Sequence, residues 1–154
     1  MSSNLKIESL DPPTSLQAIR LFEAEYKIEL PSNYKSFLIK NNGGIPNASI
    51  FKIINHPSQE DDELQLFMGL NTQINSSNLS FELSLFHDSI PVGIVPFACT
   101  GGLNLVCLDI RNGSNKVVYW DMLEFWGKNV WNESMLFDIS NTFEEFLGSL
   151  VVPG

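Results

Sequence analysis

The first clear pattern in the chain is a helical one. Asp11-Pro12-Pro13-Thr14 has the composition of a helix entry. The apolar residues that follow lie three or four positions apart, with charged residues between them: Leu16, Ile19, Phe22 and Tyr26. This spacing predicts an amphipathic first helix.

A second helical pattern follows an interruption at Leu30-Pro31. Ser32 is placed to act as its N-cap. Its apolar side is formed by Tyr34, Phe37 and Leu38. Asn41-Asn42-Gly43-Gly44 predicts the end of the helix, because Asn and Gly accept the left-handed conformation of a C-cap.

The rest of the chain is dominated by strand patterns. Runs rich in β-branched and aromatic residues predict strands at residues 50–54, 64–68, 92–98, 104–110 and 116–120. The last three are separated by Thr100-Gly101-Gly102 and by a segment containing Asn112-Gly113, which favours an antiparallel meander. Residues 79–86 fit either a short helix or an extended piece.

A last helix completes the predicted fold. Ser140 or Asn141 can cap it, and its apolar stripe consists of Phe143, Phe146, Leu147 and Leu150. The order of elements predicts an α+β fold, with a mostly antiparallel sheet packed against two N-terminal helices and a C-terminal helix. With 44% hydrophobic residues, the 154 residues suffice for a single domain, in which residues 1–13 form a loose N-terminal segment.

The charge balance limits the class of partner. The chain has 18 acidic and 9 basic residues, a net charge of −9, which disfavours nucleic acid and anionic membranes and favours a basic protein. Solubility alone would also account for such a charge. Neither a signal peptide nor a membrane span is evident, so we expect a cytoplasmic protein with reduced cysteines.

The signatures of cofactor and metal chemistry are missing from the sequence. No phosphate-binding glycine motif occurs, and His56 and His87 lack the spacing of metal ligands. Cys99 and Cys107 lie in apolar runs, where buried thiols are expected rather than a reactive thiolate. We therefore expect no cofactor, no metal and no catalytic residue.

One enzymatic alternative stays open. Asp88, Asp109, Asp121 and Glu124 could converge on one pocket, as the carboxylates of a glycoside hydrolase do. An acid-rich chain offers such combinations throughout, so this pattern carries little weight.

The remaining features suggest protein binding. Glu60-Asp61-Asp62-Glu63 is predicted to form an acidic loop, which would complement a partner rich in Lys and Arg. Trp126 and Trp131 lie in a polar context, where a partly exposed Trp can act as a binding hot spot. Core packing is the alternative role of both tryptophans.

Three blocks in fixed order resemble the SUKH superfamily, also described as cell-wall-assembly or glucan-synthesis regulators. The first carries Leu30, Pro31, Tyr34, Phe37, Leu38, Asn42, Gly43 and Gly44; the second carries Gly101, Gly102, Asp109, Trp120 and Asp121; the third carries Phe143, Phe146 and Leu147. Many members have an acidic residue near the turn at Gly101-Gly102, whereas this chain reads Leu103-Asn104-Leu105 after it. No role of that turn is therefore carried over.

The resemblance implies that the motif residues build the fold and that the function is binding. The resemblance to bacterial members implies an immunity protein, which would bind and block a cognate secreted toxin. Such a toxin is often a nuclease and would have a basic face. The resemblance to fungal members implies instead a regulator of cell-wall glucan synthesis, without known enzymatic chemistry. A non-enzymatic regulatory scaffold is therefore the alternative, and an unrecognised hydrolase is the third hypothesis.

Overall fold

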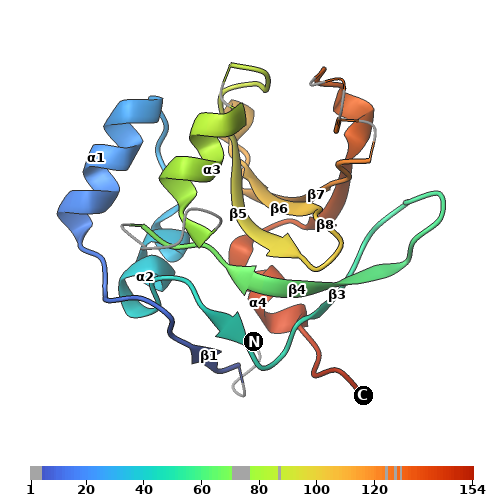
Figure 1. Cartoon of the computed structure of the whole chain (residues 1–154), viewed down its shortest axis with the longest axis horizontal. Helices are drawn as coiled ribbons and strands as arrows, with labels where there is room; N and C mark the ends of the chain where they lie inside the picture. Colours follow the sequence, from blue (N-terminus) through green and yellow to red (C-terminus); the bar gives the residue numbers. More distant parts are fainter. Residues whose placement is uncertain (1–4, 71–76, 87, 124, 127, 129) are drawn as a thin grey trace.

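The computed structural model describes residues 5–70, 77–86, 88–123, 125–126, 128 and 130–154, and it confirms the α+β fold. Figure 1 shows the helices α1 (Leu16–Tyr26), α2 (Ser32–Lys40), α3 (Leu79–Phe86) and α4 (Phe143–Ser149) around a curled sheet. The sheet consists, in spatial order, of β3 (Ile50–Lys52), β4 (Asp61–Phe67), β5 (Ile94–Thr100), β6 (Leu105–Asp109), β7 (Lys116–Trp120) and β8 (Leu136–Ser140). All neighbouring strands in it are antiparallel.

Residues 6–8 and Pro12 are held to the domain, although a loose segment was expected over residues 1–13. β1 (Ile7–Glu8) pairs with β2 (Ile45–Pro46) in a separate two-stranded sheet. The Lys6 backbone N–H also donates to Asn47 Oδ1 at 2.7 Å. Where the structure describes it, this segment therefore forms part of the fold.

The caps of the helices differ from the sequence predictions at three points. Ser32 is the first residue inside α2, and the N-cap is Pro31, whose carbonyl accepts from the Lys35 N–H at 3.0 Å. At the other end, Asn41 is extended, with a φ of −137°, so it is not a left-handed C-cap. The N-cap of α4 is Thr142, whose Oγ1 accepts from the Glu145 N–H at 3.1 Å, rather than Ser140 or Asn141.

Three further elements depart from the predicted pattern or were left open by it. Asp61, Asp62 and Glu63 do not form a loop, because they pair with β3 and begin β4. Residues 79–86 are helical and form α3, which follows β4 and precedes β5 in the chain. Strand β8 was not predicted.

The sheet curls until its two edge strands meet. Ile54, just after β3, donates its backbone N–H to the carbonyl of Asp138 in β8 at 2.9 Å. The Tyr119 hydroxyl of β7 donates to Asp62 of β4 at 2.6 Å, although β5 and β6 separate these strands. The sheet therefore curls around the face that carries Tyr119.

The face inside the curl packs against α2 and α4 through aromatic rings. Tyr34 and Phe143 contact each other edge to face, with ring centroids 5.0 Å apart, and both contact Phe97 of β5. Each such ring buries a large apolar area and adds an edge-to-face attraction. This aromatic cluster is the main core.

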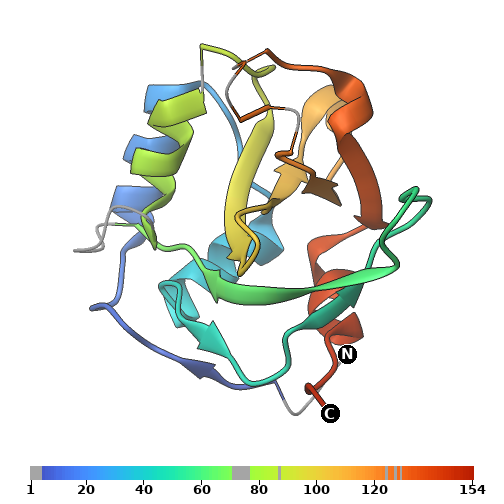
Figure 2. The ribbon, with the colours of Figure 1, turned by 45° about the vertical axis from the view of Figure 1, so that its right-hand side comes forward.

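The opposite face of the sheet is covered by α3 and by the segment between β7 and β8. Trp120 lies fully buried there, with ring centroids 5.1 Å from Phe86, 5.1 Å from Phe125 and 5.4 Å from Trp131. Figure 2 shows α1 beside α3 on one flank, where the Tyr26 hydroxyl donates to the Ser80 carbonyl at 3.0 Å. In the part of the chain that is described, no helix has the length and apolarity needed to cross a membrane.

Candidate functional site

The acidic segment of residues 60–63 lies at the start of β4. Since successive side chains of a strand point to opposite faces, Asp62 points into the curl, where it accepts the hydrogen bond from Tyr119. Glu63 accepts from Ser49 Oγ at 3.0 Å. Glu60, Asp61 and Glu63 are exposed, and Asp62 is half-buried. The segment therefore presents carboxylates to solvent from a rigid strand rather than from a loop.

Next to this segment the surface forms an acidic hollow of about 550 Å³. Its walls come from β4, from the chain around β2, from the turn between β5 and β6, and from Pro153. The principal lining residues are Asp62, Glu63, Gln65, Asn47, Ser49, Gly101 and Gly102. Of its two acidic residues, Asp62 points into the curl, so Glu63 is the one whose carboxylate a basic side chain would meet here.

An apolar groove of about 370 Å³ lies on the other side of the same turn. It is bounded by α3, by β4 to β6 and by Trp126. Its apolar lining consists of Leu66, Leu85, Phe86, Leu103, Leu105 and Trp126, with Gln65, Glu82, Cys99 and Thr100 as the other residues. Gln65 lines both the acidic hollow and the apolar groove, so the two form one continuous surface around the β5–β6 turn.

The two predicted hot-spot tryptophans have different environments. Trp126 is 52% exposed and borders the apolar groove. Trp131 is only partly exposed and packs against the buried Trp120. The structure therefore brings Trp126, but not Trp131, to the groove.

Burial changes the acidity of two groups in the groove. It raises the pKa of the Glu82 carboxyl. It also raises the pKa of the Cys99 thiol to about 11, with a further contribution from the nearby Glu82 charge. Buried Cys107 likewise has its pKa raised by burial. Both cysteines are free thiols and are protonated at neutral pH, which disfavours them as nucleophiles.

His56 joins the β3–β4 hairpin to the end of β7. Its Nε2 donates to Asp121 at 2.8 Å, and its Nδ1 accepts from the Ser58 backbone N–H at 3.2 Å. Its ring packs against Phe137, with a centroid distance of 4.5 Å. The pair of His56 and Asp121 thus holds the curl closed.

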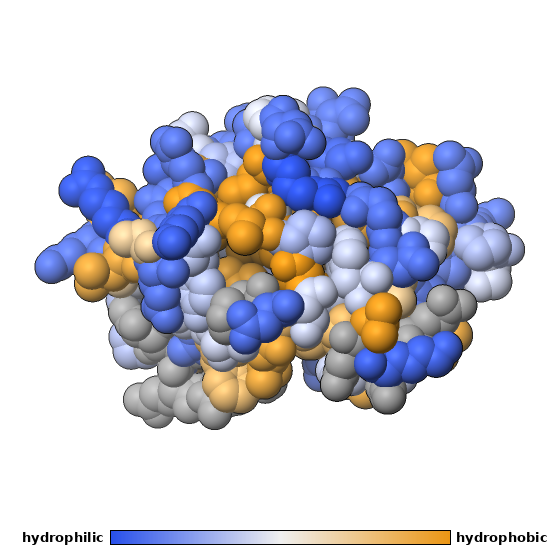
Figure 3. Space-filling view, turned by 90° about the horizontal axis from the view of Figure 1, so that it is seen from above, coloured by the Kyte–Doolittle hydropathy of each residue, from blue (hydrophilic) through white to orange (hydrophobic). Residues whose placement is uncertain are grey.

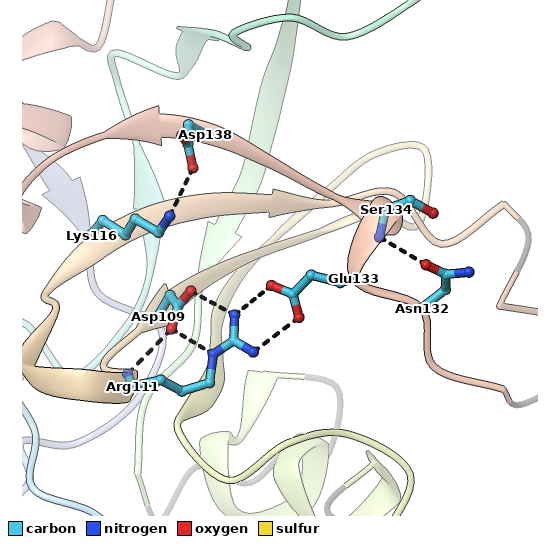
Figure 4. A network of polar contacts seen from close by, with 7 residues as sticks. All are labelled: Asp109, Arg111, Lys116, Asn132, Glu133, Ser134 and Asp138. Atoms are coloured by element: carbon cyan, nitrogen blue, oxygen red, sulfur yellow. Dashed lines mark hydrogen bonds and ion pairs between the residues drawn. The ribbon is translucent and has the colours of Figure 1, made fainter.

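Asp109 belongs to a separate ion network, shown in Figure 4. Arg111 makes two side-chain bonds of 2.9 Å to Asp109 and bonds of 3.0 and 2.7 Å to Glu133. Burial disfavours the charged Asp109 carboxylate, but the bonds from Arg111 outweigh it and lower the pKa of Asp109. Nearby, Lys116 pairs with Asp138 at 3.2 Å.

Three of the four acidic residues considered for a hydrolase are described by the structure, and these three do not share a pocket. Asp109 and Asp121 lie at opposite ends of the β6–β7 pair, since Asp109 pairs with Lys116 and Asp121 follows Trp120. Asp88 is exposed, and Glu124 lies outside the described residues, as does His87. The described residues include no group of three His, Cys, Asp or Glu side chains that could hold a metal ion.

A second apolar hollow, of about 220 Å³, lies between the end of α1 and the segment before β5. Figure 3 views this end of the molecule and shows apolar surface at the centre, surrounded by hydrophilic side chains. Tyr26, Ile28, Leu83, Ile90, Pro91 and Val92 contribute most of its lining. The acidic hollow shares a lining residue with the apolar groove but none with this second hollow. The groove is therefore the better candidate for binding a basic partner.

Comparison with known proteins identifies the family. The SUKH_6 family model, described as SMI1-KNR4 cell-wall, matches residues 16–147. The chain belongs to the SUKH family. SUKH proteins are generally non-enzymatic immunity proteins or regulators. The chain is also 33% identical over 148 residues to the SPbeta prophage-derived uncharacterized protein YokK of Bacillus subtilis (strain 168), covering 86% of this chain and 73% of that protein.

The SUKH motif residues of the first block lie in the interior. Asn42 is buried, and its amide donates to the Pro12 and Leu70 carbonyls and accepts from the Leu70 N–H, at 2.7–2.9 Å. Gly43 and Gly44 have positive φ values of 77° and 131°. A Cβ on Gly43 would lie 2.8 Å from the Phe67 carbonyl oxygen. Buried side chains complete the block: Leu30, Tyr34, Phe37 and Leu38.

The other two SUKH blocks are structural as well, except at the β5–β6 turn. Their buried residues are Asp109, Trp120, Phe143 and Phe146, while Leu147 is partly buried against the core. At Gly101 and Gly102 an added Cβ would meet no close neighbour. Close packing therefore does not require glycine at this turn.

Sequence reasoning selected Trp126 but missed the other residues of the apolar groove, among them Glu82, Leu85 and Leu103. Glu82 is the one charged residue in the otherwise apolar and Ser-containing α3 sequence. Leu103 is an apolar residue in a glycine-containing turn, and Leu85 is an apolar residue on the exposed side of α3. The sequence signals that could have pointed to them were the charge of Glu82 within an apolar segment and the position of Leu103 within a turn.

Proposed function

We propose that this SUKH protein is an immunity protein, which binds a cognate secreted toxin and neutralises it by covering a basic face of the toxin. The observation that carries the proposal is the continuous surface formed by the acidic hollow and the apolar groove. Family membership supports it, because the immunity type is one of the functional types of the family. The comparisons leave the toxin itself unspecified.

The two parts of this surface suit the two requirements of tight binding. Carboxylates on β4 and a net charge of −9 would speed association with a basic partner. Exposed apolar side chains around Trp126 would supply the desolvated contacts that slow dissociation. A nuclease fits this chemistry, because it must attract a polyanionic substrate with basic residues that an acidic protein can cover.

The test is co-expression with a toxin encoded beside the gene of this protein. We expect wild-type protein to restore growth and to form a complex with a catalytically inactive form of that toxin. A toxin from an unrelated gene pair is the control, and it should not be neutralised. Absence of both binding and growth rescue would refute the proposal.

A regulatory scaffold in cell-wall synthesis is the second candidate. The specific observation in its favour is the cell-wall description of the matching family model. In that case no toxin gene would adjoin the gene of this protein, and its deletion would change cell-wall composition. Unchanged cell-wall composition after deletion would count against the scaffold.

A further inference from the structure

We infer that the apolar groove receives a Lys or Arg side chain from an apolar segment of the partner, with the Glu82 carboxylate as its ion-pair partner. This inference rests on the proposed protein-binding function and adds the position and chemistry of the contact. It follows from three groups in the groove and from the charge around it.

Glu82 is the first of these groups. It lies on α3, is partly buried and lines the groove together with Leu85 and Phe86. Its carboxylate has no hydrogen-bond or ion-pair partner among the described residues. A partly desolvated carboxylate without a partner lowers the stability of the free protein, and a cation that enters the groove would compensate it.

Leu103 is the second group. Its φ of 68° lies in the left-handed region, which is uncommon for a leucine, and its side chain is 69% exposed. An exposed leucine in this conformation contributes little to the core and costs conformational energy. Its position on the rim of the groove gives it a use as an apolar contact for a partner.

Trp126 is the third group, and its ring is supported from within the protein. Its ring centroid lies 6.2 Å from that of Phe86 and 6.3 Å from that of Phe125. About half of the side chain remains exposed at the groove. An indole held in this way can attract a cation through its π face and can pack against an aliphatic stem.

The charge of the surroundings selects a cation over a neutral side chain. Among the described residues that line it, the groove has one carboxylate and no basic side chain, and Gln65 connects it to the acidic hollow with Asp62 and Glu63. Lys and Arg have long apolar stems and a charged end, so they match apolar walls with a carboxylate. The occupant is therefore a basic side chain with apolar neighbours.

The test compares wild-type protein with Glu82→Gln, which keeps the shape of the side chain and removes its charge. Glu29→Gln is the matched control, because Glu29 is exposed and does not line the groove. Two probes are used: the inactive toxin encoded beside the gene, and random linear peptides displayed on phage and selected on the wild-type protein. The selected peptides are then titrated as synthetic peptides.

We expect the selected peptides to share a Lys or Arg between apolar residues. Their affinity, and that of the toxin, should fall about tenfold or more with Glu82→Gln and should be unchanged with Glu29→Gln. Leu103→Asn, which removes the apolar contact at the rim without adding a charge, should also reduce peptide affinity.

The two arms separate the failure of the inference from the failure of the proposed function. If the toxin binds the wild-type protein and Glu82→Gln equally well, the groove inference is wrong and the immunity function stands. If the toxin does not bind but the peptides depend on Glu82, the immunity function is wrong and the groove inference stands. Recovery of no peptide, or of peptides without a basic residue, would overturn the groove inference.

Discussion

Among single residues, Glu82 gives the most direct stability prediction. Burial raises the pKa of its carboxyl in the folded protein, so the charged form is less favourable there than in the unfolded chain. Below the ordinary pKa of Glu, about 4.3, the carboxyl is protonated in both states and this loss of stability is absent. The loss grows as the pH rises from there through the pKa that Glu82 has in the folded protein. Removing the ionisable group should therefore stabilise the protein at neutral pH.

The measurement is urea unfolding of wild-type protein and Glu82→Gln between about pH 4 and pH 8. We expect Glu82→Gln to be the more stable at neutral pH, with the difference shrinking towards pH 4. Glu29→Gln, at an exposed position, should unfold like the wild type at each pH. A loss of stability in Glu82→Gln at neutral pH would show that the carboxylate has a favourable partner in the free protein.

Arg111 gives a prediction with the opposite pH dependence. Its bonds lower the pKa of Asp109 despite burial, so they contribute stability above the ordinary Asp pKa and lose it as Asp109 becomes protonated. Arg111→Ala leaves a buried carboxylate without its partner. We expect it to lower the free energy of unfolding by about 2–3 kcal/mol at neutral pH, with a smaller difference near pH 3.

Lys116→Ala is the control for Arg111→Ala in the same unfolding experiment. The Lys116–Asp138 pair is exposed on both sides, so its loss should change the free energy of unfolding by less than about 1 kcal/mol. Equal effects of the two substitutions would contradict a special role for the Asp109–Arg111–Glu133 network.

Among elements, the junction between α2 and β2 depends on glycine. Gly44 has a φ of 131°, and a Cβ there would collide with the Glu8 carbonyl oxygen of β1. Gly44→Ala should therefore lower the free energy of unfolding by about 2 kcal/mol or more, in thermal or urea unfolding. Gly101→Ala, where a Cβ meets open space, should change it by less than about 1 kcal/mol. A stable Gly44→Ala variant would contradict the close packing of β1 at this junction.

The sequence predicted most elements because each has a local signal. The spacing of Ile19 and Phe22 predicted α1, and the antiparallel order of β5 to β7 followed from their glycine-containing turns. Strand β8 was missed because its apolar and polar positions alternate weakly, and Ile139 is its one buried residue. The acidic start of β4 looked like a loop because its pairing with β3 is a tertiary contact rather than a local preference.

The candidate site was predictable only in part, for a similar reason. Residues 60–63 and Trp126 could be chosen from composition, and of these the structure places Asp62, Glu63 and Trp126 around one surface. The groove itself depends on how α3 packs beside the β5–β6 turn, which no local pattern encodes. Glu82 and Leu103 therefore became candidates only with the three-dimensional arrangement.

At the scale of the whole molecule, the curl of the sheet separates the core from the proposed binding surface. The motif residues and aromatic rings lie mainly inside the curl or between the sheet and its helices. The acidic hollow and the apolar groove lie at the surface around one turn. Surface side chains can thus differ while the core is retained, which suits a fold used for partner-specific binding.

The net charge of −9 leads to a prediction about association rates. Replacing Glu60, Asp61 and Glu63 by lysine reverses the charge of the exposed positions at the start of β4 and keeps the half-buried Asp62 that bonds to Tyr119. We expect slower association with a basic partner, by about tenfold or more at low salt, and a weaker dependence on ionic strength. Stopped-flow mixing at several salt concentrations measures both quantities, and unchanged rates would remove this segment from the interface.

The central claim is that this SUKH protein acts by binding a toxin. Isothermal titration of the purified protein with the inactive form of the toxin encoded beside its gene tests it most directly. We predict a saturable complex that is weakened by Glu82→Gln and left intact by Glu29→Gln. Absence of heat and of complex formation with the wild-type protein, at concentrations where both proteins are folded, would contradict the claim.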